Sequence, residues 1–126
     1  MSIEVIHTNK APEAIGPYEQ AIRANGFVYT AGQIALVPET GELVAGGVEE
    51  QARRVLDNVT AVLEAAGTSW DKAVKTTIYL SDMADFAAVN AIYESYLGSG
   101  KPARTTVAVA GLPKGALVEV DVVALA

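Results

Sequence analysis

Residues 48–80, VEEQARRVLDNVTAVLEAAGTSWDKAVKTTIYL, decide the class of fold. Their apolar residues are spaced as in a helix in the first half and as in a strand in the second. In the first half apolar residues recur at steps of three and four, which predicts an amphipathic helix that ends at Gly67. The apolar stripe consists of Val48, Ala52, Val55, Leu56, Val59, Val62, Leu63 and Ala66. In the second half the side chains alternate, which predicts a strand. Its apolar face carries Val74, Thr76, Ile78 and Leu80.

The flanking segments add a second helix and a hairpin. Residues 85–97 again have a helical period, and Gly98 follows as a stop signal. Asn25-Gly26 is the strongest short hairpin signal, because both residues accept the left-handed backbone of a two-residue turn. We therefore expect residues 21–24 and 27–30 to pair as antiparallel strands.

The end of the chain predicts two more strands. Residues 105–110 and 117–125 are rich in β-branched side chains and are joined by Gly-Leu-Pro-Lys-Gly, so we expect an antiparallel pair. Residues 38–47 read as a surface loop. The order of elements predicts a single α+β domain over residues 1–126, with two helices packed on one face of a mostly antiparallel sheet.

Composition narrows the function. The chain has 126 residues, about 13 kDa and no cysteine, which excludes disulfides, thiolate metal sites and a cysteine nucleophile. The net charge of −6 and the lack of a basic tract argue against a nucleic-acid binder. Charged residues make up only 19%, against roughly 25% in an ordinary soluble domain, so we expect an oligomer that buries apolar faces.

The last predicted strand supports the same expectation. It is apolar on both sides, with Val118, Val120 and Val122 on one and Val123 and Leu125 on the other. A sheet covered by helices on one face usually leaves its second face polar. We therefore expect sheets to pack on sheets across subunits.

The first residues show neither a cationic segment nor a long apolar stretch, and no run approaches the roughly 18 apolar residues of a membrane helix. We expect a cytoplasmic protein without a membrane partner.

His7 is the single histidine, and a lone histidine is poor evidence for a metal site or a catalytic triad. Residues 98–101, Gly-Ser-Gly-Lys, look like part of a phosphate loop, but Pro102 and a strand follow, so no helix N-terminus can receive a phosphate.

Two charged residues interrupt apolar strands. Arg104 opens a strand of small and β-branched residues, where its planar fork of donors suits a carboxylate; it could equally be an edge-strand arginine or part of a structural ion pair. Glu119 lies between two valines, where apolar surroundings raise the pKa of a carboxyl and suit proton transfer; the alternative is a residue that faces solvent.

The predicted final hairpin places these two residues on one face. They would still lie four residues apart along the ladder, roughly 13 Å, too far for one small substrate. A neighbouring copy of the chain could bring Arg104 and Glu119 together.

Asn90 falls in the apolar stripe of the second helix, where it could brace a backbone turn or line a pocket. Tyr18 follows Gly-Pro on a rigid turn, where it could close a pocket or simply pack.

Together these segments resemble the RidA/YjgF family of reactive-intermediate deaminases, in order and over nearly the whole chain. The resemblance is carried by Ile15-Gly16-Pro17-Tyr18, Thr30-Ala31-Gly32-Gln33, Leu56-Asp57-Asn58-Val59, Glu64-Ala65-Ala66-Gly67, Lys75-Thr76-Thr77, Asp85-Phe86 with Val89-Asn90, Pro102-Ala103-Arg104-Thr105, Leu112-Pro113-Lys114-Gly115 and Val118-Glu119-Val120. The stretch from Pro-Ala-Arg to Val-Glu is the specific part.

The resemblance implies a chorismate-mutase-like α+β fold assembled as a homotrimer, with three sites in the clefts between subunits. It also implies hydrolysis of 2-enamine/2-imine acids, such as 2-iminobutanoate and 2-iminopropanoate, to 2-oxo acids and ammonia. Such imines leak from pyridoxal-phosphate enzymes, so the implied role is control of metabolite damage. The resemblance implies no cofactor and no metal.

The family's site carries over residue by residue. Arg104 matches the arginine that grips the substrate carboxylate, and Glu119 matches the glutamate that handles the attacking water and the departing ammonia. Tyr18 and Asn90 match residues of the cleft, and Gly32 matches the glycine whose backbone approaches the ligand.

Two positions depart from the family's pattern, and the function keeps alternatives. Thr106, which we count among the substrate-binding residues, stands where many members carry cysteine, and Ala31 stands where several carry serine. A metabolite-binding module without catalysis would have the same sequence features. Members have also been described as translation inhibitors with ribonuclease activity, and a deaminase for another enamine acid is a third possibility.

Overall fold

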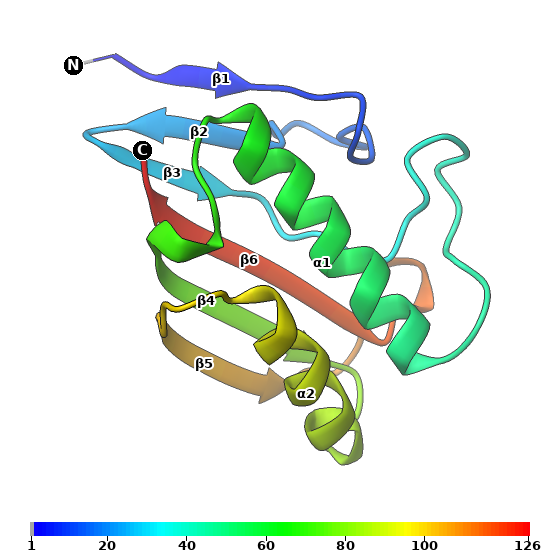
Figure 1. The fold of residues 1–126 in the computed structure, drawn as a ribbon. Coiled ribbons are helices and arrows are strands. Elements are labelled where there is room, and N and C mark those ends of the chain that lie inside the picture. The colour runs from blue at the N-terminus through cyan, green and yellow to red at the C-terminus, as the bar shows by residue number, and fades with distance from the viewer. Residues whose placement is uncertain (1) are drawn as a thin grey trace.

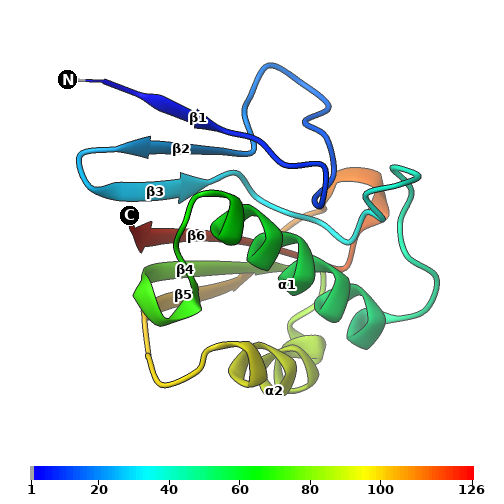
Figure 2. The same ribbon diagram turned by 45° about the horizontal axis from the view of Figure 1, so that its top comes forward.

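Both helices lie on one face of a six-stranded sheet in the computed structural model, which describes residues 2–126 (Figures 1 and 2). The strands lie in the order β1-β2-β3-β6-β4-β5. The strands are β1 (Glu4–Ile6), β2 (Ala21–Ala24), β3 (Phe27–Thr30), β4 (Ala73–Leu80), β5 (Ala103–Ala108) and β6 (Val118–Leu125). The helices are α1 (Val48–Ala65) and α2 (Phe86–Tyr96), with short 3₁₀ turns at Trp70–Lys72, Met83–Asp85 and Pro113–Gly115. The predicted α+β class is confirmed.

Local signals in the sequence explain most of these elements. The helix α1 ends where predicted, because Gly67 has a φ of 77° and the Thr68 amide donates to the Leu63 carbonyl at 3.0 Å. Asn25 and Gly26 both have positive φ and join β2 to β3 through a two-residue turn. The strand β1 was not predicted, because three residues are too short to show alternation.

The predicted hairpin of the last two strands is wrong. β5 pairs in parallel with β4, and β6 lies between β3 and β4, antiparallel to both. The helix α2 returns the chain to the starting end of β4, which makes β5 parallel to it. Residues 109–117 then cross the end of β4, where the Val109 amide donates to Leu80 and the Ser81 amide to Leu117. Because β6 is the most apolar strand, it takes a central place, and β5 becomes an edge.

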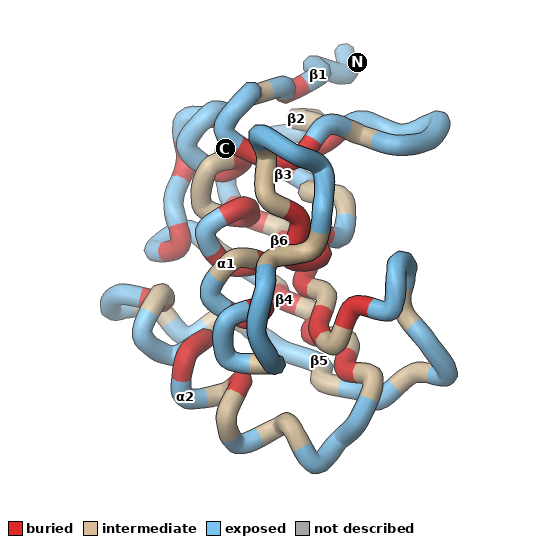
Figure 3. The backbone as a smooth tube through the Cα atoms, turned by 90° about the vertical axis from the view of Figure 1, so that its right-hand side faces the viewer, coloured by how far each residue is buried: buried red, intermediate tan, exposed pale blue. Residues whose placement is uncertain are grey.

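The core fills the space between the helices and the sheet (Figure 3). The side chains of β6 that face the helices are fully buried against the stripe of α1, as predicted from the valines. On β4 the predicted face is correct for Thr76, Ile78 and Leu80. Val74 is the exception: it lies at a register shift between Ala73 and Lys75 and is exposed, because a bulge interrupts the alternation there.

Two buried amides fasten the loops beside the sheet. The Gln20 side chain accepts from the Thr8 amide at 2.8 Å and donates to the Pro12 carbonyl at 2.8 Å. Asn58 on α1 donates to the carbonyls of Ile34 and Leu36 at 3.2 and 2.9 Å. Because buried amides need hydrogen-bond partners, these contacts fix the loops. The loops reach the face of the sheet opposite the helices, which is called the open face below.

The second face of the sheet carries no helix and is partly apolar, as expected from the last strand. Tyr29 and Leu125 lie on it and are 45% and 47% exposed. Val107 of β5 is on the same face, since its register partner Tyr79 points away from the helices. Within residues 2–126, no helix is long and apolar enough to cross a membrane.

Candidate active site

Arg104 lies on the edge strand β5, on the face that the helices cover. In the parallel ladder it is opposite Thr76, which is buried under α2. Side chains of partners in a ladder point to the same face, so Arg104 extends toward α2 and not toward the open face. Its position on a stiff strand restricts where the guanidinium can go.

The helix α2 holds the Arg104 side chain. The centre of the guanidinium lies 5.5 Å from the ring centre of Phe86 and 5.4 Å from that of Tyr93, within the range of cation–π attraction. Asn90, on the same side of the helix, accepts a hydrogen bond from Arg104 through its Oδ1 at 2.5 Å. Arg104 and Asn90 line a cavity of about 690 Å³ together with the loop after α2. The remaining donors of the guanidinium are free to bind an anion.

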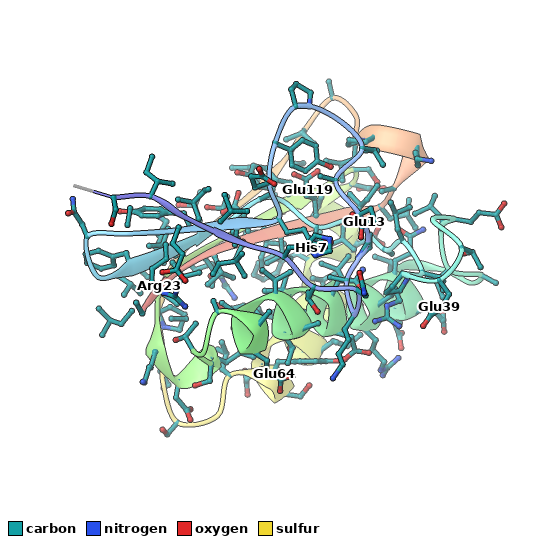
Figure 4. All side chains as sticks on the ribbon, turned by 90° about the horizontal axis from the view of Figure 1, so that it is seen from above. His7, Glu13, Arg23, Glu39, Glu64 and Glu119 are labelled. Atoms are coloured by element: carbon teal, nitrogen blue, oxygen red, sulfur yellow. The ribbon has the colours of Figure 1, made fainter. Side chains whose placement is uncertain are left out.

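Glu119 lies on β6, on the open face. Its register partner on β4 is Tyr79, and the carboxyl points into a cavity of about 290 Å³ that also takes in Tyr18 and Gly32. Figure 4 shows Glu119 on the side of the sheet away from α1, near the loop that carries Glu13. In the part of the chain that the structure describes, no donor bonds to the Glu119 carboxylate.

The surroundings of Glu119 favour its protonated form. Partial burial raises the pKa of the Glu119 carboxyl, and the negative charge of Asp121 raises it further. A carboxyl with a raised pKa holds its proton more readily and can still give it up, so it can both accept and return a proton. The arrangement therefore suits proton transfer better than permanent anion pairing.

Gly32 leaves room for that carboxyl. The backbone of Gln33 bridges to Val120 with hydrogen bonds of 2.9 and 3.1 Å, which brings residue 32 against β6. A Cβ atom at position 32 would overlap Glu119 Oε2 and would lie 2.8 Å from its Cδ. Glycine is therefore required at position 32 if the carboxyl is to stay where it is.

The prediction that Arg104 and Glu119 share a face is wrong. It assumed that β5 pairs with β6, whereas both strands pair with β4. Arg104 is opposite Thr76 and Glu119 is opposite Tyr79, so they lie roughly 10 Å apart along the strands and point to opposite faces. A single chain cannot place both on one small substrate, for a stronger reason than the sequence suggested.

Comparison with known proteins identifies the family. A family model described as Endoribonuclease L-PSP matches residues 8–126. A human protein named 2-iminobutanoate/2-iminopropanoate deaminase is 48% identical over 121 residues, which cover 96% of this chain and 88% of that protein. A Yersinia pestis structure described as a protein of unknown function of the conserved Rid protein family has a TM-score of 0.96 and 52% identity, over 99% of this chain and 100% of that one.

The chain belongs to the RidA/YjgF family. Another member similar to it is TdcF of E. coli, whose structure with bound serine has a TM-score of 0.93 and 40% identity over 98% of both chains. The family is described as an endoribonuclease and the human relative is named a deaminase, so membership fixes the fold and the family but not one activity.

Within one chain the other predicted residues divide between the two cavities, whereas the family resemblance places them in one cleft between subunits. Tyr18 lies at the open-face cavity, where its hydroxyl accepts a hydrogen bond from the Ile15 amide at 3.3 Å. Asn90 forms a hydrogen bond with Arg104 and lines the other cavity. This favours the interpretation of Asn90 as a pocket residue over its alternative role of bracing a backbone turn. Thr106 is on the same face as Arg104, and its buried hydroxyl has no partner within residues 2–126. Its binding role stays a prediction.

Sequence reasoning missed the two rings that hold Arg104. Phe86, Asn90 and Tyr93 follow one another at steps of four and three, so they had to share one side of α2. That spacing was the available signal, but the register of β5 was needed to place Arg104 against it.

Among the described residues there is no cluster of His, Cys, Asp or Glu able to hold a metal. His7 bonds to Glu13 at an exposed position.

Proposed function

We propose that this Rid protein is a hydrolytic deaminase of 2-imino acids. The observation that carries the proposal is the fixed guanidinium of Arg104, held by Asn90 and two rings with donors left over for a carboxylate. The relative named a 2-iminobutanoate/2-iminopropanoate deaminase supports the substrate class. The E. coli relative with bound serine supports a ligand that has a carboxylate beside a carbon–nitrogen bond.

The proposed reaction divides the work between two groups. Arg104 binds the carboxylate of the iminium acid and orients it. Glu119 takes a proton from water while the water oxygen forms a bond to the imine carbon. Glu119 then returns the proton to the amino nitrogen, and the C–N bond breaks as ammonia leaves. The new hydroxyl gives its proton back to the Glu119 carboxylate as the carbonyl forms, and that proton passes to ammonia, so the products are a 2-oxo acid and ammonium. An enamine acid first takes a proton at carbon and becomes the same iminium.

The proposed site lies between copies of the chain. Arg104 and Glu119 point to opposite faces of one sheet, so a neighbour must supply one of them. The partly apolar open face supports association. We propose the homotrimer of the Rid family, with Arg104 of one copy at the cavity of Glu119 on the next.

The proposed setting is the cytoplasm, where pyridoxal-phosphate enzymes release reactive imines. The chemistry assigned to Arg104 and Glu119 needs no cofactor, because the carbon of a protonated imine is already electrophilic. Since such imines also hydrolyse unaided, a modest reduction of the barrier is useful for damage control.

A coupled assay tests the proposal. Threonine dehydratase generates 2-iminobutanoate, and decay of the imine is followed with and without the protein at equal concentrations. Faster decay, with a matching release of 2-oxobutanoate, supports the deaminase. Binding of 2-oxobutanoate without any change in imine decay would instead support a metabolite sensor.

The family description also names an endoribonuclease. A net charge of −6 and the acidic lining of the Glu119 cavity oppose the binding of a phosphate backbone, so we favour the deaminase. RNA cleavage that persists through purification and disappears in Glu119→Gln would reverse that preference.

A further inference from the structure

Glu119 belongs to a cluster of three polar side chains on the open face. Tyr79 of β4 is directly opposite Glu119 in the antiparallel ladder, and Asp121 is two residues further along β6 on the same face. Two residues of a strand span roughly 7 Å, so the two carboxyls are neighbours. Tyr79 lies across the ladder from both.

The cluster contains one hydroxyl, that of Tyr79, and it forms a hydrogen bond with only one of the two carboxyls. Tyr79 donates to Asp121 Oδ2 at 2.9 Å, diagonally across the ladder. Glu119 receives no donor from the described residues and is half buried. Two neighbouring acids therefore have different surroundings: Asp121 accepts a hydrogen bond from Tyr79, and Glu119 accepts none from the described residues.

The charges around Glu119 point the same way. The negative charge of Asp121 raises the pKa of Glu119, second to burial. The pKa of Tyr79 is itself raised, chiefly by its hydrogen bond to Asp121, so its hydroxyl keeps the proton that it donates. The loop across the cavity contributes Glu13 and Tyr18, and none of the described residues that line the cavity is positively charged. A carboxyl whose pKa is raised in this way is suited to carry the proton.

We propose that Asp121, anchored by Tyr79, is a positioning residue whose negative charge beside Glu119 favours the protonated form of that carboxyl. The use of that proton in catalysis rests on the proposed deaminase function, whereas the coupling between the two acids does not. Asp121 touches no substrate in this proposal and acts only through its charge beside Glu119.

Direct titration tests the coupling without any assay of activity. Carbon-13 NMR of the glutamate side-chain carboxyls, with Glu119→Gln used to assign the signal, gives the pH at which Glu119 titrates. We expect Asp121→Asn to lower that pH, because a like charge is removed. Asp121→Glu, which keeps the charge, should leave it near the wild-type value. Tyr79→Phe should lower it by less, because the released Asp121 carboxylate turns toward water.

Asp57→Asn is the matched control. It breaks a tyrosine–aspartate hydrogen bond of 2.8 Å, from Tyr96, between the two helices and away from the cavity, so it should not move the titration. An unchanged titration in Asp121→Asn, or an equal shift in Asp57→Asn, would overturn the coupling. If Tyr79→Phe titrates like the wild type, the role of Tyr79 as an anchor is wrong.

The pH profile of imine hydrolysis tests the link to catalysis. The acid limb of kcat/KM should move to lower pH in Asp121→Asn by the same amount as the NMR titration, and should return in Asp121→Glu. A protein that shifts in NMR but hydrolyses no imine would refute the deaminase and keep the coupling. A shifted titration with an unshifted limb would refute the catalytic use of the Glu119 proton.

Discussion

The two faces of the sheet carry functional groups of opposite charge type, Arg104 and Glu119, in different surroundings. Arg104 is exposed; the rings of Phe86 and Tyr93 and the side chain of Asn90 fix it, while its remaining donors stay in water. Glu119 is half buried next to a second acid, and none of residues 2–126 donates a hydrogen bond to it. The guanidinium stays charged at any physiological pH, so its surroundings control only position. The surroundings of Glu119 control whether it carries a proton, so changes on the two faces should affect different steps.

The largest expected effect comes from the open face. Glu119→Gln keeps the size of the side chain and removes proton transfer, so kcat for imine hydrolysis should fall by about 10³-fold while KM changes little. The control is Glu39→Gln, a similar change at an exposed loop position. A Glu119→Gln protein with wild-type kcat would show that another group activates the water.

On the helix-covered face, a change should affect binding. Arg104→Ala removes the charged donors for the carboxylate, and KM should rise by about 100-fold. Arg104→Lys should recover only part of this, because an ammonium cannot form the bidentate pair. Arg53→Ala, which removes the same charge at an exposed position of α1, is the control. An unchanged KM in Arg104→Ala contradicts the assignment of carboxylate binding.

A smaller effect should follow from moving the Glu119 carboxyl without removing it. In Gly32→Ala the new Cβ overlaps that carboxyl, which must turn aside, so kcat should fall by about tenfold. Gly111→Ala is the matched control, because a Cβ there meets nothing within 4 Å. Equal kcat in the two variants would mean that the carboxyl tolerates displacement.

The smallest effect concerns stability. Because the folded-state pKa of Glu119 is raised, a charged Glu119 destabilises the folded state at pH values above that pKa. Glu119→Gln should therefore unfold at higher urea concentration than wild type at pH 8, by at most about 1 kcal/mol since the group is half exposed to solvent. As the pH falls through the folded-state pKa toward the ordinary value, the folded wild type takes up the proton and the difference should disappear. A difference that is constant with pH would exclude this cause.

Local patterns predicted the elements of the fold better than their pairing. The periods of α1 and α2 and the Asn25-Gly26 turn are properties of a few consecutive residues, and all three are confirmed. The partner of β5 depends on where α2 returns the chain, which no local pattern records. The sequence therefore suggested a hairpin where a crossing connection exists.

The candidate site shows the same division. The residue types stood out in the sequence, because Arg104 and Glu119 interrupt apolar strands and Asn90 interrupts an apolar helix stripe. The contacts that tune them depend on register: Tyr79 meets Asp121 only because β4 and β6 are antiparallel with this alignment. Sequence reasoning could name the reacting groups but not their neighbours.

The central claim is that Arg104 and Glu119 of different copies form one site, and mixing two impaired variants, assayed well below the wild-type KM, tests it most directly. Arg104→Ala and Glu119→Gln are unfolded together and refolded as mixed assemblies, with each variant refolded alone as the control. If neighbours share a site, about a quarter of the sites regain both groups, and imine hydrolysis should recover to about a quarter of the wild-type rate. Activity no higher than that of the separately refolded variants, in assemblies shown to contain both chains, would contradict the account.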